Sequence, residues 1–290
     1  MHTPVLLDET IYFLNPKPND NFVDATFGLG GHSFKLLSFI KPNGKILALE
    51  WDPYLVEIIK NKTMPQNIIL KNTNFKNIKK VVKEEKFSNI KGVIFDLGIS
   101  NWHYKNSKRG FSFNKNEFLD MRINPFEVKI TAFDVINYFS REELIDVFKN
   151  YGDEREAEKI TDLILKKRKE KKIETTKELA EIIVEAKKHK KKNIHPATQI
   201  FMALRNFINQ ELKNLEIGLE DAYDILIKGG RIVVITFNGL EDRVVKKVFK
   251  KIKIKNAKLV TKNVIRPTPK EIKNNPASRS AKLRVIEKNE

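Results

Sequence analysis

The sequence predicts an α/β fold in which a Rossmann-like sheet is interrupted by an inserted helical domain. Two observations predict the sheet: short apolar strands alternate with helices over the first hundred residues, and a glycine-rich turn joins the first strand to a helix. One observation predicts the insertion, because residues 107–204 contain helical patterns and loops but no convincing strand. We therefore expect residues 1–106 and 205–290 to form one domain and residues 107–204 to form another.

The first strand and its turn carry the most informative pattern. The strand at 22–24 ends in a carboxylate and runs into Gly28-Leu29-Gly30-Gly31, after which a helix begins. About 20 residues further on, a second strand at 45–49 is followed by Glu50. Glycines let the backbone approach a ligand, and an acid after the second strand can accept hydrogen bonds from both hydroxyls of a ribose. This spacing predicts an adenosyl cofactor.

Two details of the turn favour S-adenosylmethionine over NAD. A dinucleotide fingerprint has a third glycine where Ser33 stands, so that the helix packs tightly below a pyrophosphate. Asp24 would repel a pyrophosphate, whereas a carboxylate there suits a cationic sulfonium or amino group. Taken alone, the turn is equally compatible with a plain strand–turn–helix whose glycines bind nothing.

Further strands place more side chains at the same edge of the predicted sheet. Strands at 67–71 and 90–98 follow, and parallel strands expose ligand-binding groups at their carboxyl ends. The groups expected at that edge are Asp24, Glu50, Phe75 and Asp96.

The insertion and the C-terminal part have their own predicted elements. Helices are expected at 144–149, 154–168 and 179–186, and one long helix is expected from Pro196 towards Leu226. Gly229-Gly230 then leads into a strand at 231–237, and a last strand at 281–286 closes the chain.

Charge and composition restrict the class of partner. The 290 residues include 55 Lys and Arg against 37 Asp and Glu, a net charge of +18. Such an excess favours a polyanionic partner, most commonly nucleic acid, although a lysine-rich proteome would produce it equally well. The absence of cysteine excludes disulfides and thiolate metal sites. With no bilayer-length apolar segment and no signal peptide, we expect a cytoplasmic protein without a membrane partner.

Several motifs outside the glycine turn occur in a distinctive order. They are Asp96-Leu97-Gly98-Ile99-Ser100, Arg109-Gly110-Phe111-Ser112-Phe113, Leu119-Asp120-Met121-Arg122, His195-Pro196-Ala197-Thr198, Leu240-Glu241-Asp242-Arg243, Asn275-Pro276 and Arg279-Ser280-Ala281-Lys282-Leu283-Arg284. Together with the turn, they make the chain resemble, over nearly its whole length, the bacterial 16S ribosomal RNA cytosine-N4 methyltransferase family.

The resemblance implies a class I methyltransferase fold that uses S-adenosylmethionine to methylate N4 of a cytidine in the decoding centre. The implied partner is small-subunit ribosomal RNA or the 30S particle, and the inserted domain is expected to recognise RNA. Transferred to this sequence, the cofactor contacts are Gly30, Gly31, His32, Glu50, Phe75, Asp96 and His103.

Catalysis is expected to depend on Asp96, with Asn238 as the second candidate. An acceptor must draw on the hydrogens of the target amine while its lone pair turns towards the methyl group. The chain departs from the family at three places. Glu50 replaces an aspartate, Ser100-Asn101-Trp102-His103 replaces Ser-Ser-Pro-Gln, and Phe237-Asn238-Gly239 replaces Phe-His-Ser.

These departures leave two other functions open. One is methyl transfer to another RNA, and the other is an RNA-binding ribosome assembly factor with weakened catalysis. An NAD dehydrogenase is disfavoured by Ser33 and Asp24. His2, His32 and His195 lack metal-ligand spacing, so no essential metal is expected. The oligomeric state, a dimer included, stays open.

Overall fold

The computed structural model describes residues 4–61, 63–187, 195–254 and 256–289. The chain divides into two compact units, one formed by Met1–Ile99 with Leu212–Glu290 and the other by Ser100–Glu211. The boundaries expected from the sequence, 107 and 204, lie inside the second unit at both ends.

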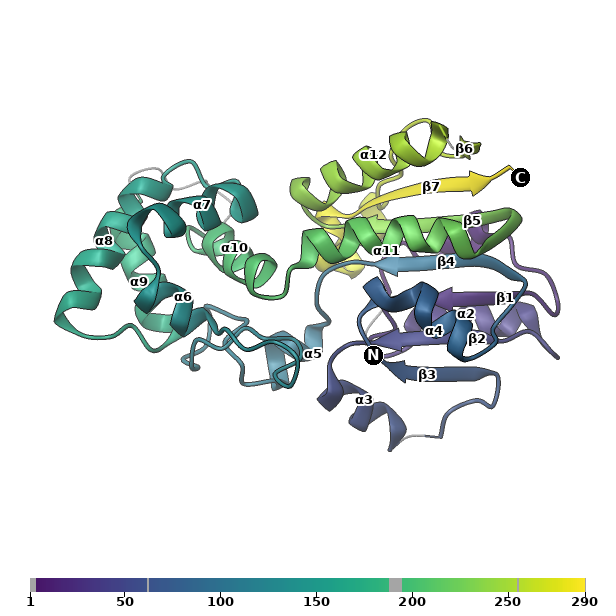
Figure 1. The fold of residues 1–290 in the computed structure, drawn as a ribbon, viewed down its shortest axis with the longest axis horizontal. Coiled ribbons are helices and arrows are strands. Elements are labelled where there is room, and N and C mark those ends of the chain that lie inside the picture. The colour runs from purple at the N-terminus through teal and green to yellow at the C-terminus, as the bar shows by residue number, and fades with distance from the viewer. Residues whose placement is uncertain (1–3, 62, 188–194, 255, 290) are drawn as a thin grey trace. The chain divides into compact units, whose positions relative to one another are not determined.

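The first unit is built on a seven-stranded sheet with the order β3-β2-β1-β4-β5-β7-β6 (Figure 1). The strands are β1 (Asn21–Asp24), β2 (Ile46–Glu50), β3 (Ile68–Asn72), β4 (Ile90–Asp96), β5 (Leu226–Thr236), β6 (Ala257–Leu259) and β7 (Lys282–Lys288). Strands β1 to β5 are parallel, and β7 pairs antiparallel with both β5 and β6. Because the strand order reverses between β1 and β4, their carboxyl ends flank the crevice in which open α/β sheets bind ligands.

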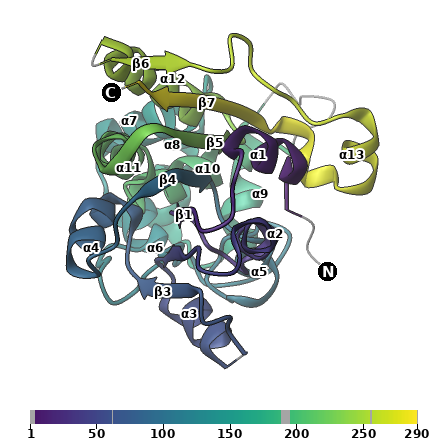
Figure 2. The same cartoon turned by 90° about the vertical axis from the view of Figure 1, so that its right-hand side faces the viewer.

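Helices cover both faces of this sheet (Figure 2). They are α1 (Leu7–Leu14), α2 (Gly31–Ile40), α3 (Pro53–Lys60), α4 (Ile78–Glu84), α11 (Glu211–Ile225), α12 (Gly239–Ile254) and α13 (Pro269–Asn274), with the short 3-10 turns η1 (Phe75–Asn77) and η2 (Pro276–Ser280). Side chains of α4, α11 and α12 form one core with Val23, Leu49 and Phe95 of the sheet. On the other face, a Cβ added at Gly92 would lie 2.7 Å from Leu14 of α1, so α1 approaches β4 closely there.

The second unit is helical, with α5 (Asn101–Asn106), α6 (Ala132–Tyr138), α7 (Arg141–Gly152), α8 (Ala157–Glu170), α9 (Thr176–Ala186) and α10 (Thr198–Ile208). Thr131, Ser140 and Thr175 begin α6, α7 and α9 with capping boxes. A single antiparallel bridge, Phe118 with Thr175, is the extended pairing found among the described residues of this unit. Helices α7 and α10 meet where a Cβ at Gly152 would lie 2.7 Å from the Gln199 carbonyl oxygen.

The long helix expected from Pro196 towards Leu226 is wrong, because the chain breaks between α10 and α11. Gln210 adopts a left-handed φ of 51° at the break. Asn209 accepts a hydrogen bond from Ile123 N at 2.8 Å and donates one to the Met121 carbonyl at 2.8 Å. The apolar periodicity continues through this point, so the helix ends because of tertiary hydrogen bonds that the periodicity does not encode.

The strand expected at 231–237 in fact begins earlier. Strand β5 already pairs at Leu226 with Ile90, and its register then shifts before Arg231 pairs with Gly92. Gly229 has a left-handed φ of 71° inside this irregularity. The glycine pair therefore lies in a bulge within the strand rather than before it.

Candidate active site

The glycine turn between β1 and α2 has a backbone that side chains would disturb. Gly30 is the N-cap of α2 with a φ of 82°. A Cβ at Gly30 would lie 2.7 Å from the ring of Phe34 and 2.8 Å from that of Phe27. A Cβ at Gly31 would collide with the ring of Pro4. The first turn of α2 has neither a capping side chain nor an acidic residue, so its positive end remains suited to a negatively charged ligand group.

Asp24, at the end of β1, is bound inside the protein. It is 2% exposed, and it accepts hydrogen bonds from Ser33 Oγ at 2.6 Å and from Thr26 N at 3.1 Å. Burial raises the pKa of Asp24. The interpretation of Asp24 as a partner for a cationic ligand stays a prediction, and the carboxylate already has two hydrogen-bond donors within the protein. Ser33, which occupies the third-glycine position, holds this carboxylate in place.

His32 and Asp96 form the most unusual pair at this edge. His32 is 6% exposed, and its Nε2 lies 3.5 Å from Asp96 Oδ2. Burial lowers the pKa of His32, but the carboxylates of Asp96 and Asp24 outweigh it and the net pKa is raised. Among the described residues, neither ring nitrogen nor Asp96 Oδ1 has a hydrogen-bond partner. Such buried atoms cost about 1–3 kcal/mol each, so they indicate a place for polar groups of a ligand.

Glu50 lies directly against the glycine turn. Its Oε2 accepts a hydrogen bond from Gly28 N at 2.9 Å, and its Oε1 accepts one from Asp52 N at 2.8 Å. Burial raises the pKa of Glu50 to about 7. The Trp51 backbone also donates a hydrogen bond to this carboxylate, so of about four acceptor positions one remains for a ribose hydroxyl.

Phe75 offers an apolar surface next to β3. It begins η1, is half-buried, and meets Phe95 edge-on with ring centroids 5.5 Å apart. A Cβ at Gly218 of α11 would lie 2.8 Å from the Phe75 ring, so the glycine is what allows this packing. A ring held this way can flank a flat, apolar group such as adenine.

Asn238 stands at the start of α12, with its side chain engaged by Glu241. Its Oδ1 accepts a hydrogen bond from Glu241 N at 2.9 Å, and its amide donates to Glu241 Oε1. Glu241 Oε2 also accepts a hydrogen bond from Phe237 N at 2.7 Å. This reciprocal arrangement is a helix cap that the Asn-x-x-Glu spacing already signals. A catalytic role for Asn238 stays a prediction.

His103 belongs to the second unit. It lies in α5 with 4% exposure, and its Nδ1 is 3.0 Å from Ser100 Oγ. Its ring packs edge-on against Trp102 and Phe111, each with centroids 5.5 Å away. The expected cofactor contact of His103 stays a prediction, because it belongs to a different unit from the other candidates.

The motif around Arg109 stabilises a loop within the second unit. Arg109 is 8% exposed and donates to the carbonyls of Arg122 and Ile123 at 2.9 and 2.7 Å. Asp120 pairs with Arg122 at 2.7 Å. These groups explain how the loop between α5 and α6 is ordered without invoking a ligand.

The two lysine-rich runs of the second unit, 166–169 and 187–192, are not uniformly available to a ligand. Arg168 donates to the carbonyls of Ile136 and Phe139, both at 2.8 Å, and Lys187 forms an ion pair with Glu154 at 2.6 Å. The remainder of the second run, 188–192, lies outside the described residues.

Sequence reasoning missed two residues that shape the site. Thr26 Oγ1 accepts a hydrogen bond from Asp96 N at 2.7 Å and so ties the ends of β1 and β4 together. Asn74 is 2% exposed, and its side chain accepts from Lys76 N to start the turn that carries Phe75. Both are short polar residues two positions after the end of a strand, which is the signal that marks them.

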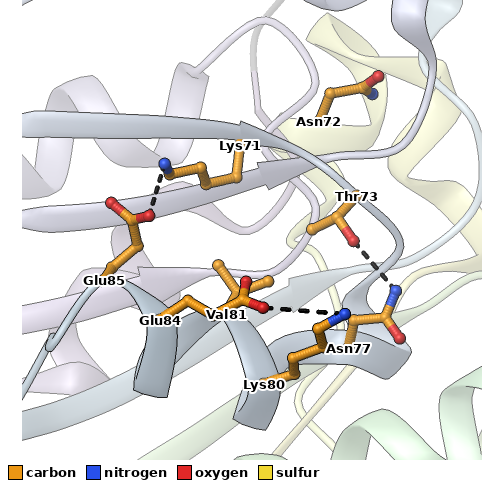
Figure 3. A pocket seen from close by; sticks show the side chains of 8 residues that line it. All are labelled: Lys71, Asn72, Thr73, Asn77, Lys80, Val81, Glu84 and Glu85. Carbon is orange, nitrogen blue, oxygen red and sulfur yellow. Dashed lines mark hydrogen bonds and ion pairs between the residues drawn. The ribbon is translucent and has the colours of Figure 1, made fainter.

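One hollow in this unit lies beside β3 and α4 (Figure 3), and no residue of the glycine turn lines it. It measures ≈ 240 Å³, and its lining is Lys71, Asn72, Thr73, Asn77, Lys80, Val81, Glu84 and Glu85. The charged groups neutralise one another, with Lys71 2.6 Å from Glu85 and Lys80 3.8 Å from Glu84. We conclude that this hollow is a solvated surface rather than the ligand site.

Comparison with known proteins identifies the family to which this chain belongs. A model of the MraW methylase family matches residues 1–289. The chain belongs to the MraW methylase family. Two relatives named ribosomal RNA small subunit methyltransferase H support this. The Sulfurihydrogenibium sp. (strain YO3AOP1) protein is 44% identical over 98% of both chains, and the Caldicellulosiruptor saccharolyticus protein is 40% identical over 99% of both.

Membership of the MraW methylase family confirms the predicted cofactor, S-adenosylmethionine, and the predicted class I fold. A Streptococcus mutans protein solved in complex with SAH superposes with a TM-score of 0.50, covering 99% of each chain at 13% identity. At that identity the likeness concerns the fold alone. The open glycine turn, Glu50 and the unsatisfied atoms of His32 and Asp96 fit such a cofactor.

No group of three or more His, Cys, Asp or Glu side chains in the described ranges is placed to hold a metal ion. Within the same ranges, no helix combines the length and apolar character that crossing a bilayer requires.

Proposed function

We propose that this protein transfers a methyl group from S-adenosylmethionine to N4 of a cytidine in the decoding centre of small-subunit ribosomal RNA. Relatives at 44% and 40% identity carry the name ribosomal RNA small subunit methyltransferase H, which supports ribosomal RNA as the substrate class. The observation that carries the reaction is the buried Asp96 Oδ1, which has no hydrogen-bond partner among the described residues. The cytosine-N4 target rests on the motifs given above.

Three groups of the first unit would hold the cofactor. Glu50 would accept a hydrogen bond from a ribose hydroxyl, and Phe75 would flank the adenine ring. The first turn of α2 would face the carboxylate of the methionyl part, because its N–H groups and helix dipole favour negative charge. Positioning by these groups supplies a large part of the acceleration.

The cofactor supplies an electrophilic methyl carbon bound to a sulfonium. The cytosine N4 lone pair is delocalised into the ring, so the amine needs an acceptor for its hydrogens. Asp96 Oδ1 would accept one N–H and take the proton that N4 releases as the N4–methyl bond forms, while the methyl–sulfur bond breaks and S-adenosylhomocysteine leaves. His32, whose pKa the two carboxylates raise, lies 3.5 Å from Asp96 Oδ2 and would keep that carboxylate oriented.

The helical second unit, in this proposal, recognises the RNA. Methyl transfer to a base requires that the base be unpaired or extruded from its stack. Recognition at such places relies on shape, phosphate contacts and stacking, for which the lysines and exposed rings of the unit are suitable groups. His103 would contact the cofactor, and the Asn238 side chain would form a hydrogen bond with the target amine.

The decisive test is a product analysis. The protein is incubated with methyl-labelled S-adenosylmethionine and small ribosomal subunits lacking the modification, and the RNA is digested to nucleosides. We expect label in N4-methylcytidine, and a rate reduced roughly 10²–10³-fold in Asp96→Asn. Asp224→Asn, which changes an exposed carboxylate paired with Lys79, is the matched control and should keep full activity.

Other outcomes of this test have definite meanings. Label in a different nucleoside, or only in another RNA, would replace the proposed target. RNA that carries no label, with protein that still binds S-adenosylhomocysteine, would favour the ribosome assembly factor. The observation that supports this second function is Asn238, which stands in the place of the family's histidine.

A further inference from the structure

A second hollow in the first unit has a different character from the one in Figure 3. It lies among α12, β6, β7 and the segment after β6, elements that Figure 1 places together at one edge of the sheet, and it measures ≈ 220 Å³. Its lining has five cationic side chains and no acidic one: Lys246, Phe249, Lys250, Lys253, Leu259, Thr261, Lys262 and Arg284.

The lysines of α12 differ sharply between the two faces of the helix. On the face towards α11, Lys247 pairs with Glu216 at 2.9 Å and Lys251 pairs with Glu220 at 2.7 Å. On the face that lines the hollow, Lys250 and Lys253 are exposed and have no ion-pair partner in the described part of the chain. The helix therefore has one neutralised edge and one uncompensated edge.

Among the described residues, Asp242 is the carboxylate that pairs with cationic side chains at the rim of the hollow. Asp242 receives Arg284 at 2.7 Å and lies 3.5 Å from Lys246, which fixes the guanidinium in position. Lys262, across the hollow on the segment after β6, has no acidic partner among the described residues. Lys250, Lys253 and Lys262 thus converge on one opening with their charge unbalanced.

Two apolar side chains line the hollow. Phe249 is 2% exposed and belongs to the main core, whereas Leu259 is 38% exposed. Thr261 accepts a hydrogen bond from Val285 N at 3.0 Å and fixes the wall beside it. Cationic side chains beside apolar ones suit a polynucleotide. Its phosphates carry regularly spaced negative charges, and its bases offer apolar surfaces next to them.

We propose that this hollow binds the phosphodiester backbone of RNA, as a contact separate from the cofactor site. Lys250, Lys253 and Lys262 would neutralise phosphates and release their counterions, while Leu259 would contact an adjacent ribose or base. The inference rests on the proposed function in taking RNA as the partner. Contacts of this kind fix the register of a nucleic acid and carry no sequence information.

The test compares two double variants of one helix that remove equal charge. Lys250→Ala/Lys253→Ala removes the uncompensated lysines, and Lys247→Ala/Lys251→Ala removes the paired ones. The dissociation constant for a ribosomal RNA fragment containing the decoding centre is measured over a series of salt concentrations. Each lost phosphate contact lowers the slope of log K against log salt by about 0.7–0.9.

We expect the first variant to lose roughly 1.5 units of slope and to bind at least about tenfold more weakly near 0.1 M salt. The second variant should keep the wild-type slope, and both should bind S-adenosylhomocysteine normally. Equal slopes for the two variants would overturn the hollow as an RNA contact and leave the proposed methyl transfer intact. A wild-type protein that binds no RNA would overturn it as well, whereas a wrong target base would leave the slopes unaffected.

Discussion

His32 Nε2 lies 3.5 Å from Asp96 Oδ2, and this pair joins the first turn of α2 to the end of β4. Asp24, at the end of the neighbouring strand β1, adds a second negative charge that acts on the same imidazole. Asp24, His32 and Asp96 come from separate segments of the chain, yet the parallel sheet brings them together at one edge. The two carboxylates therefore affect the pKa of His32, and a titration of this histidine reports on the arrangement of the site.

Asp96→Asn is expected to lower the pKa of His32. The Asp96 carboxylate favours the imidazolium, so its removal leaves burial, which favours the neutral ring, with less opposition. An NMR titration of the histidine ring protons measures the change, and His195 in the second unit serves as the internal reference. An unchanged His32 pKa would mean that the two side chains do not interact in solution.

Cofactor affinity is expected to fall as the pH decreases through about 7, the pKa to which burial raises Glu50. A ribose hydroxyl donates to the ionised carboxylate, so protonation competes with binding, by about tenfold per pH unit well below the pKa. Titration calorimetry with S-adenosylhomocysteine between pH 5.5 and about 8 measures this dependence. Glu50→Gln should bind more weakly at pH 8 and show a flat profile; a sloping profile in that variant would assign the dependence to another group.

The same carboxyl affects stability in the opposite direction. Because the pKa of Glu50 rises from 4.5 to about 7 on folding, the folded protein binds this proton more tightly than the unfolded chain. The free energy of unfolding should therefore fall as the pH rises through this window, by at most about 3 kcal/mol from this group. Urea unfolding without cofactor at pH 5 and 8 tests the sign.

Ser33→Ala is expected to destabilise the first unit by about 1–3 kcal/mol, because it leaves the buried Asp24 Oδ2 without its hydrogen bond. Ser38→Ala is the matched control: Ser38 is on the same helix but is exposed and bonds only to the Lys35 carbonyl. Denaturant unfolding of both variants gives the comparison. Equal stabilities would show that Asp24 does not depend on Ser33.

Two substitutions of Asn238 separate capping from catalysis. Asn238→Ala should cost about 0.5–2 kcal/mol, because it removes the acceptor for Glu241 N at the start of α12. Asn238→Ser keeps a capping oxygen and should nearly restore the stability, while removing the side-chain amide. A reduced kcat in the serine variant would support the catalytic role; a wild-type kcat would reduce Asn238 to a cap.

The strands and the glycine turn were predictable because their causes are local. Continuous apolar runs, glycines at φ values that side chains avoid, and acids directly after strands all lie within a few residues of one another in the sequence. The expectation that Glu50 and Asp96 meet the turn needed only one added rule, that parallel strands end at the same edge. Family motifs added the cofactor and the class of fold.

Other features required knowledge of partners distant in the sequence. The break at Asn209 depends on Ile123 and Met121, some 86 and 88 residues away. The surroundings of Asp24 depend on which residue of α2 faces it. That residue is Ser33, whose hydroxyl donates a hydrogen bond to the carboxylate. The uncompensated face of α12 depends on where α11 places Glu216 and Glu220.

By itself, the sequence determined the α/β class, the glycine turn, the cofactor and the family, because these follow from local pattern and from motifs in a fixed order. The tertiary structure alone decided which polar groups are satisfied and which are not. That distinction depends on packing between segments: Asp24 receives Ser33 and Thr26, whereas Asp96 Oδ1 and the His32 ring nitrogens receive no hydrogen bond from the described residues. Burial makes such unmet hydrogen-bonding capacity costly, and a bound ligand removes that cost.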